Sequence, residues 1–457
     1  MKILYYNWAP LESGEGGGVA VYQKNLLDYL LKSHRHELYF LSSGHNYREN
    51  INEIKIVSVD NNISRELKTF DMVNSPVLAP VQQSIKNTKA YLEDTTIYLL
   101  LKKFIEAVGG FDVIHFNNLE GLSLSVLKLK EDFPQTKFVY SLHNYFPLCT
   151  QVTLWQTRPN SIGHICTKKD YSECANCYPK INYDAERLAR KYKQFREFSA
   201  FKGIYSQHFP DSDDPKIYRE FEERNIFYIN KYIDINLAVS ERVKDIFSAR
   251  GLNEKKIVVS YIGTDVAEIQ RNDNCADINS DPFKIIYMGY MNFKKGFYFF
   301  LQSLYNMPSE AAKNIVVTFA TKYHPEYNKR EVAAIENLKT KFRDVILLDG
   351  YKREEFESLL RDQNLGVVPV LWEDNLPQVA IEQIAYGVPI ICSDLGGASE
   401  LHSRNPDFTF KAGDLNDFVK KLENILNNRN LLKEYWSTVM PLMTMEKHVK
   451  FLESIYR

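Results

Sequence analysis

Two acidic residues eight positions apart, Asp374 and Glu382, lie where a loop is predicted to turn into a helix. Pro377 between them can open that helix, because a first-turn proline gives up only an N–H that would have no partner. The start of a helix offers free N–H groups and the positive end of its dipole, which suit an anion such as a diphosphate. The pattern therefore indicates an anion site with two carboxylates in reach of one ligand. An ordinary loop before a buried helix stays open as the alternative.

A lysine and two glycines could take part in the same chemistry. Lys295 precedes Gly296 at another predicted helix start, where a cation and helix N–H groups together would neutralise a departing diphosphate without a metal ion. Gly17 and Gly18 follow the first predicted strand and lack side chains, so the backbone there can approach a phosphate or a sugar closely. A solvated lysine is the plain alternative for Lys295, and a glycine run alone is weak evidence.

The elements that must position these residues form two series of alternating strands and helices, which predict parallel sheets covered on both faces. Strands of the first series are expected at residues 2–8, 37–42, 54–59, 112–116, 137–142 and 235–240. Those of the second are expected at 284–288, 315–319, 345–348, 365–370 and 389–392, with helices starting near residues 296, 326, 353 and 377. A polar stretch at 272–282 indicates a linker between two domains. Two such units leave a cleft where ligands of these folds bind.

Composition narrows the class of protein. The chain has 457 residues, 44% hydrophobic and 25% charged, which is typical of soluble globular domains. A formal net charge of −1 gives no reason to expect nucleic acid as a partner. No apolar run approaches the roughly 20 residues that a spanning helix needs, and nothing marks export. We therefore expect a cytoplasmic protein, in which the six cysteines are thiols or metal ligands rather than disulfides.

The order of several short motifs is more specific than any one of them. The series is Gly17-Gly18, Asp112-Val113-Ile114-His115, Ser141-Leu142-His143-Asn144, Gly289 to Lys295-Gly296, Asp374 to Glu382, and Gly396-Gly397-Ala398-Ser399-Glu400. In order and spacing it resembles the retaining glycosyltransferases of the GT-B fold, glycosyltransferase family four, over nearly the whole chain. The sequence from Trp372 to Pro377 especially resembles that of bacterial enzymes that assemble surface polysaccharides.

The resemblance implies an α/β protein with two Rossmann-like, doubly wound domains facing across a cleft. Residues 1–270 would bind the acceptor and residues 283–430 the nucleotide sugar, while the last helix, within 431–457, would return across the junction to the N-terminal domain. The implied activity is transfer of a hexose-type sugar from a nucleotide diphosphate donor to a saccharide or lipid-linked saccharide. A non-catalytic relative that only binds in the cleft or partners an active enzyme is the alternative, and an epimerase or phosphorylase on this scaffold is a more distant one.

Roles for the acidic pair and its loop follow from the resemblance. Asp374 would contact hydroxyls of the donor sugar and support positive character at the anomeric carbon, and Glu382 would bind the ribose hydroxyls. A carboxylate suits this, because it accepts two hydroxyl hydrogen bonds in a fork. Asn375 and Leu376 would complete the donor-binding loop. Since Asp is one methylene shorter than the family's usual Glu, Glu373 is an open alternative for the first role.

The remaining implied roles concern the leaving group and the acceptor. Lys295 would stabilise the diphosphate, opposite Gly17 and Gly18. The family usually has an arginine immediately after the glycine equivalent to Gly289, where this chain has Tyr290, so one expected cation is missing unless Lys294 replaces it. His143 would lie near the donor sugar and acceptor and contribute to the transition state, whereas His115 is expected to be structural. Front-face attack, with the departing phosphate taking the acceptor's proton, would require no metal or cofactor.

Four cysteines, Cys149, Cys166, Cys174 and Cys177, lie in a polar insertion at about 145–182. Their C-x16-C-x7-C-x2-C spacing allows a structural zinc site. The last pair has the short spacing at which two cysteines bind one tetrahedral ion, and thiolates are common zinc ligands. His164 is a further candidate ligand. Free thiols, or cysteines with simple packing roles, remain an equally good interpretation.

Two further segments have patterns that could serve a function. The basic amphipathic stretch 186–202 could touch anionic lipid at the inner face of the membrane, but a solvated helix packed on the core is the favoured interpretation. Asp211-Ser212-Asp213 matches the metal-binding triplet of another glycosyltransferase fold, yet it lies between Pro210 and Pro215 and is interpreted as a loop and helix cap.

Overall fold

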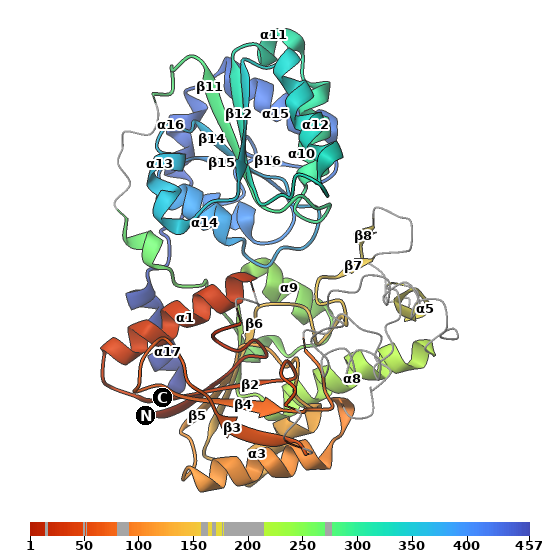
Figure 1. The fold of residues 1–457 in the computed structure, drawn as a ribbon, viewed down its shortest axis with the longest axis vertical. Coiled ribbons are helices and arrows are strands. Elements are labelled where there is room, and N and C mark those ends of the chain that lie inside the picture. The colour runs from red at the N-terminus through yellow and green to blue at the C-terminus, as the bar shows by residue number, and fades with distance from the viewer. Residues whose placement is uncertain are drawn as a thin grey trace. The chain divides into compact units, whose positions relative to one another are not determined.

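The computed structural model describes residues 1–13, 17–48, 51, 53–79, 91–156, 163–166, 171–175, 177, 214–269 and 277–457. The stretch 186–202 and the triplet 211–213 therefore lie outside the described residues. The chain divides into two compact units, and Figure 1 shows a sheet with helices in each. The first unit contains Met1–Ile262 and Met445–Arg457, and the second contains Gly263–Thr444.

The first unit is built on an eight-stranded sheet in the order β10-β9-β6-β5-β1-β2-β4-β3. All neighbours are parallel except β3 and β4, which are antiparallel. The expected parallel sheet is therefore confirmed, with an antiparallel edge strand. The strands are β1 (Lys2–Tyr6), β2 (Glu37–Ser43), β3 (Lys55–Ser58), β4 (Lys68–Val73), β5 (Val113–Phe116), β6 (Lys137–Leu142), β9 (Ile235–Ala238) and β10 (Ile257–Val259).

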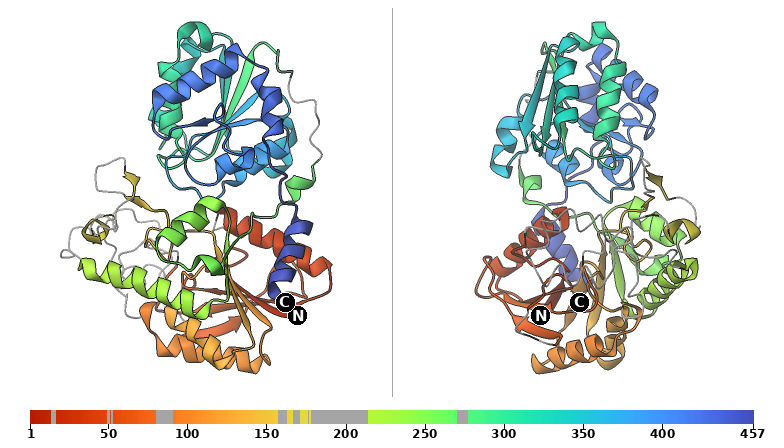
Figure 2. Two further views of the ribbon diagram at one scale, coloured as in Figure 1. Left: turned by 180° about the vertical axis from the view of Figure 1, so that it is seen from behind. Right: turned by 45° about the vertical axis from the view of Figure 1, so that its right-hand side comes forward.

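Helices cover this sheet on both faces (Figures 1 and 2). They are α1 (Gly17–Lys32), α3 (Thr95–Ala107), α4 (Leu129–Asp132), α8 (Pro215–Tyr232), α9 (Glu241–Ala249) and α17 (Met445–Tyr456), joined by 3₁₀ turns including η1 (Leu124–Lys128). A small hairpin of β7 (Trp155–Gln156) and β8 (His164–Ile165) and the short helix α5 (Tyr171–Ala175) lie in the insertion.

Helix α17 comes from the end of the chain and packs against α1. The hydroxyls of Tyr456 on α17 and Tyr5 on β1 are 2.8 Å apart in the core. Glu453, one turn earlier on α17, lies 2.8 Å from His36. Residues 431–444, in contrast, belong to the second unit, so the segment after 430 contributes to both.

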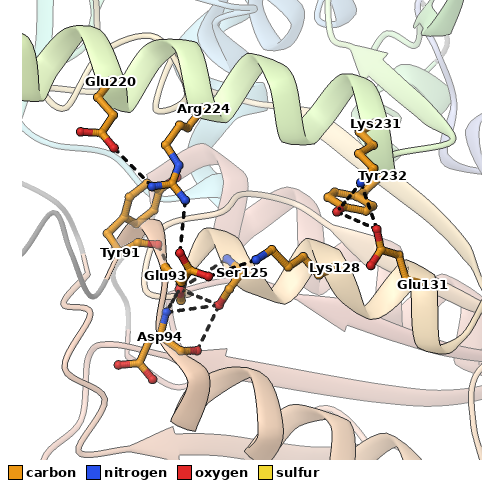
Figure 3. Close-up of polar contacts among 11 residues, drawn as sticks. Tyr91, Glu93, Asp94, Ser125, Lys128, Glu131, Glu220, Arg224, Lys231 and Tyr232 are labelled. Carbon is orange, nitrogen blue, oxygen red and sulfur yellow. Dashed lines mark hydrogen bonds and ion pairs between the residues drawn. The ribbon is translucent and has the colours of Figure 1, made fainter.

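Helix α8 is fixed to the segments before β6 by two groups of polar contacts (Figure 3). Arg224 pairs with Glu93 at 3.6 Å. At the end of α8, Lys231 and Tyr232 both donate to Glu131, at 3.0 and 2.9 Å. Because exposed ion pairs contribute little free energy, these contacts mainly fix the position of α8. The helix also forms one wall of a cavity in this unit.

The second unit has a six-stranded, fully parallel sheet in the order β13-β12-β11-β14-β15-β16. Its strands are β11 (Phe283–Met288), β12 (Ile315–Thr321), β13 (Asp344–Asp349), β14 (Leu365–Val368), β15 (Ile390–Ser393) and β16 (Thr409–Phe410). Its helices are α10 (Phe297–Asn306), α11 (Ser309–Ala312), α12 (Lys329–Asn337), α13 (Phe356–Leu360), α14 (Gln378–Ala385), α15 (Leu415–Asn427) and α16 (Leu431–Glu434).

Parallel strands end at one edge of a sheet, and ligands of such folds bind at that edge. The loops after β11, β14 and β15 leave it and carry Lys295, Asp374 and Gly396. Each strand is buried at its end, so the loops start from fixed points. In neither unit do the described residues include a helix long and apolar enough to cross a membrane.

Candidate functional site

An ion pair joins the two predicted residues of opposite charge in the second unit. Lys295 Nζ lies 2.6 Å from Asp374 Oδ2, and their side chains are 31% and 10% exposed. The backbone N–H of Lys295 donates to Asn292 Oδ1 at 2.8 Å, which fixes the turn before α10. The structure therefore brings together two groups that are 79 residues apart in sequence. The Lys295 ammonium group is thus partly accessible, and it lies beside the mostly buried carboxylate of Asp374.

The loops that carry this pair are attached to each other. Leu371 N–H donates to Lys294 O at 2.9 Å. The ammonium groups of Lys294 and Lys295 lie 6.0 and 5.5 Å from the centre of the Trp372 ring, within the range of a cation–π interaction. Gly296 has φ 73°, and a Cβ there would come within 1.6 Å of a backbone oxygen of the second loop. Only glycine allows this close approach.

Glu373, the alternative to Asp374 for the first acidic role, has different partners from Asp374 in the structure. Glu373 Oε2 accepts the backbone N–H of Gly396 at 3.0 Å, and Gly397 N–H donates to Asp374 O at 2.9 Å. Glu373 therefore fixes the loop after β15, while the Asp374 side chain pairs with the lysine. Asn375 is buried in the same loop. This division of contacts favours Asp374 as the ligand-facing acid.

We expect Gly396→Ala to disrupt the site. A Cβ at Gly396 would lie 2.0 Å from Asp374 O, and the residue has φ 68°. The left-handed backbone alone costs about 1–2 kcal/mol for alanine, and displacement of the Asp374 backbone adds to it. Gly413→Ala is the matched control, because its φ is 78° with nothing within 4 Å of the new Cβ. Chemical denaturation should show a larger loss of unfolding free energy for Gly396→Ala than for Gly413→Ala. Equal losses for the two variants would contradict the steric argument.

Glu382 lies inside α14, about one turn from its start, and is half-buried. Pro377 is the residue before the helix rather than part of its first turn, because its ψ of 124° is extended. Burial raises the pKa of Glu382 to about 7, the Arg353 guanidinium opposes this rise and Asp265 adds to it. Arg353 and Asp265 form an ion pair with each other. The second unit therefore holds a carboxyl group whose pKa is close to neutral pH.

In the first unit, His143 follows β6, is half-buried and contacts a network of buried side chains. Its Nε2 lies 3.3 Å from Asn117 Oδ1, and its ring is 5.1 Å from that of Tyr22 on α1. The Tyr22 hydroxyl in turn lies 2.6 Å from Nε2 of His448 on α17. Burial lowers the pKa of His143 to about 3, with His448 adding to the effect. His143 is thus a neutral imidazole at working pH, suited to hydrogen bonding but a weak general base.

The other sequence candidates in this unit differ in character. His115 is buried, with its two ring nitrogens 2.6 Å from the Tyr456 hydroxyl and 2.8 Å from Ser141 Oγ, so it is structural. Gly17 and Gly18 are exposed and form the first residues of α1. Gly17 has φ 55° and open space around its missing side chain. The first two residues of α1 therefore place no side chain at the start of the helix.

Comparison with known proteins identifies the class. Residues 282–428 match the family model of glycosyl transferases group 1. Over all of this chain, HepE of Anabaena with bound UDP is similar at 13% identity, TM-score 0.59 and 99% coverage of that chain. A glycosyltransferase from Rickettsia africae has 16% identity, TM-score 0.58 and 97% coverage. The lipopolysaccharide outer core galactosyltransferase WaaB has 12% identity, TM-score 0.58 and 99% coverage. No curated protein shows a significant sequence match.

At these identities the structural similarity defines the fold, which is GT-B with two Rossmann-like α/β units. Within the second unit, the match to the glycosyl transferases group 1 model includes Lys295, Asp374 and Glu382. The matched domain and the fold together indicate a glycosyltransferase.

Proposed function

We propose that this protein is a retaining glycosyltransferase of family four that transfers a hexose from a nucleotide diphosphate donor to a saccharide or lipid-linked saccharide during surface-polysaccharide synthesis. The observation that carries the proposal is the Lys295–Asp374 ion pair beside the start of α10, with Glu382 on α14 in the same unit. A donor with two phosphates and several hydroxyls needs this combination of cation and carboxylates.

The second unit is assigned to the donor. Lys295 and the N–H groups at the start of α10 would bind the diphosphate, whose negative charge grows as the bond to the anomeric carbon breaks. Asp374 would accept hydroxyls of the sugar and favour positive charge at that carbon. The acceptor oxygen forms its bond on the face that the leaving group vacates, and the departing phosphate oxygen takes the acceptor's proton. The chain's residues can supply this charge stabilisation without a metal ion.

Glu382 is assigned to the ribose, and its raised pKa makes donor binding sensitive to pH. Binding that uses the carboxylate must be lost as pH falls through about 7, where the free enzyme becomes protonated. Between pH 8 and pH 6, we expect the Kd of the sugar nucleotide to rise about tenfold. Calorimetry should use the intact sugar nucleotide, because its diphosphate is esterified at both ends and has no group that titrates near neutral pH. In Glu382→Gln the dependence should disappear, and an unchanged slope would refute the assignment.

The first unit is assigned to the acceptor, with His143 as the residue that contacts it. The His143 ring is held by Asn117 and Tyr22, and Tyr22 is held by His448 on α17. A neutral imidazole fixed in this way can position a hydroxyl group without removing its proton. The proposed acceptor includes lipid-linked saccharides at the membrane surface, and WaaB, which has the same fold, is named as a lipopolysaccharide outer core galactosyltransferase.

We expect His143→Ala to reduce kcat by about ten- to a hundredfold, the loss expected for one hydrogen bond in the transition state. The Kd of the sugar nucleotide should stay within about twofold, because donor binding is assigned to other residues. His143→Gln keeps a hydrogen-bonding side chain and should recover part of the rate. If His143→Ala weakened donor binding as much as turnover, the division of roles between the units would be wrong.

A calorimetric panel of nucleotide diphosphates and their sugars tests the donor class, beginning with UDP and UDP-glucose because HepE is seen with both. Transfer is then followed by NMR of the anomeric proton, and an inverted product would exclude the retaining mechanism. Excess magnesium chelator should leave the rate nearly unchanged.

A non-catalytic, sugar-nucleotide-binding protein is the second candidate. It is favoured by Tyr290, which is 63% exposed where the family usually has an arginine. Donor binding without transfer or hydrolysis, over a range of saccharide acceptors, would support it.

A further inference from the structure

Four cysteines from three separate segments of the first unit converge on one cavity. The cysteine cluster consists of Cys149, Cys166, Cys174 and Cys177, and all four line this cavity. Cys149 closes a turn after β6, where its N–H donates to Tyr145 O at 2.8 Å. Cys166 follows β8, with its N–H 2.7 Å from Leu154 O. The other two lie in and just after α5, joined by a hydrogen bond from Cys177 N–H to Cys174 O at 3.2 Å.

The surroundings of the cluster are mostly apolar. The cavity has a volume of about 40 Å³ and is also lined by Leu148, Trp155 and Phe221. Such a space exceeds that needed by one water molecule. Burial, with smaller contributions from the other sulfurs of the cluster, raises the pKa of Cys149 to about 11 and that of Cys174 to about 12. All four cysteines line this one small cavity.

We propose that the cysteine cluster binds one Zn²⁺ ion as a structural site. Four sulfur donors are a complete tetrahedral set for zinc, and a closed set of this kind has no open position for catalysis. In the described part of the chain, no three His, Cys, Asp or Glu side chains are already arranged to hold a metal ion. The cluster must therefore tighten around the ion, and the four thiols release their protons as they become ligands.

A cation in the cavity wall fits a site with four thiolates. Such a site carries two net negative charges, and the Arg250 guanidinium lies at the cavity and acts on Cys166. Arg250 is already held by Glu222 on α8, at 3.3 Å. Polar groups around the first ligands orient them and tune their charge. His164 is exposed on β8 and does not line the cavity, so the four cysteines alone make up the proposed ligand set.

The site would stabilise a segment that has little regular structure of its own. The described parts of the insertion include only a hairpin of two-residue strands and the five-residue α5. A metal ion bound by the loop after β6, the strand β8 and the α5 segment would cross-link all three. Binding free energy then becomes folding free energy for this part of the unit.

The test measures metal content and coordination in the full-length protein. Protein produced with added zinc and purified under reducing conditions should contain about one Zn²⁺ per chain. Cobalt substitution should give intense thiolate-to-metal absorption in the near ultraviolet and visible bands of a tetrahedral site. Cys174→Ser should lose most of the zinc. Cys392→Ser is the control, because Cys392 is buried in the second unit beside His402, and it should keep the metal.

A second measurement keeps the proposal testable if Cys174→Ser does not fold. A strong chelator should lower the melting temperature of the unchanged protein, and added zinc should restore it. Absence of stoichiometric zinc and of cobalt thiolate bands, with a melting temperature unaffected by chelator, would overturn the proposal. In that case, the reactive thiols are counted in the denatured, metal-free protein. Six thiols would mean that all cysteines are free, and fewer would mean that some form a disulfide.

Discussion

Lys295→Ala is expected to reduce kcat about 10²–10³-fold, the usual loss when one group that stabilises developing negative charge is removed. The Lys295 ammonium is partly exposed and 2.6 Å from a carboxylate that is only 10% exposed. A diphosphate arriving there would gain a cation that the fold already holds in position. Binding of the ground state should weaken less than the rate, because the diphosphate becomes more negative only as its bond to the sugar breaks.

The control for this variant is Lys294→Ala. Lys294 is adjacent in sequence and has its ammonium near the same tryptophan ring, so the change removes an equal charge. Because Lys295→Ala also leaves Asp374 without this cation, thermal stability must be measured alongside the rate. Lys295→Met combined with Asp374→Asn removes both charges and should recover stability but not turnover. Similar losses for Lys294→Ala and Lys295→Ala would mean that the lysine pair acts only through net charge.

Several of the predicted strands, such as β14, are apolar and buried on both faces. β6 has the predicted bounds because its run is nearly continuous and a strand covered by helices needs no polar alternation. β4 was missed, and the reason is Asp71 near its centre. That carboxylate is buried and accepts from Ser42 at 2.9 Å and Asn46 at 2.7 Å. A sequence pattern registers the charge but not these distant partners. β16 was missed because a strand of two residues is too short to show a hydrophobic pattern.

Local pattern also limits what can be known of the site. The acid pair and the lysine could be proposed because each lies at a recognisable helix start. The network that holds His143 could not be proposed, since Tyr22 and His448 are 426 residues apart and neither belongs to a motif. Glu373 likewise stayed an alternative to Asp374, because neighbouring side chains in a loop point in different directions that only the folded backbone defines.

Glu382→Ala is expected to weaken donor binding by about ten- to a hundredfold, since a charged group's hydrogen bonds to the ribose are lost. Comparing the nucleotide with its deoxyribose analogue isolates this contact. The unchanged protein should bind the ribose form more tightly than the deoxyribose form, and the variant should bind both equally. The loss of affinity from the substitution and the loss from removing the hydroxyl are then not additive. Glu357→Ala is the matched control, because Glu357 is an exposed acid on α13 whose ion pair is with Arg361. A variant that still prefers ribose would show that another residue binds the hydroxyls.

The same substitution should have the opposite effect on folding. Burial raises the pKa of Glu382 in the folded chain to about 7, so the folded state holds its proton more tightly than the unfolded state. Its contribution to the free energy of unfolding is therefore complete below the unfolded pKa and is lost as pH rises through about 7. At pH 8 the ionised carboxylate is a cost, and Glu382→Ala should melt at the same or a higher temperature. Loss of binding together with retained stability would identify Glu382 as a residue kept for its ligand, whereas a sharply lower melting temperature at pH 8 would make it structural.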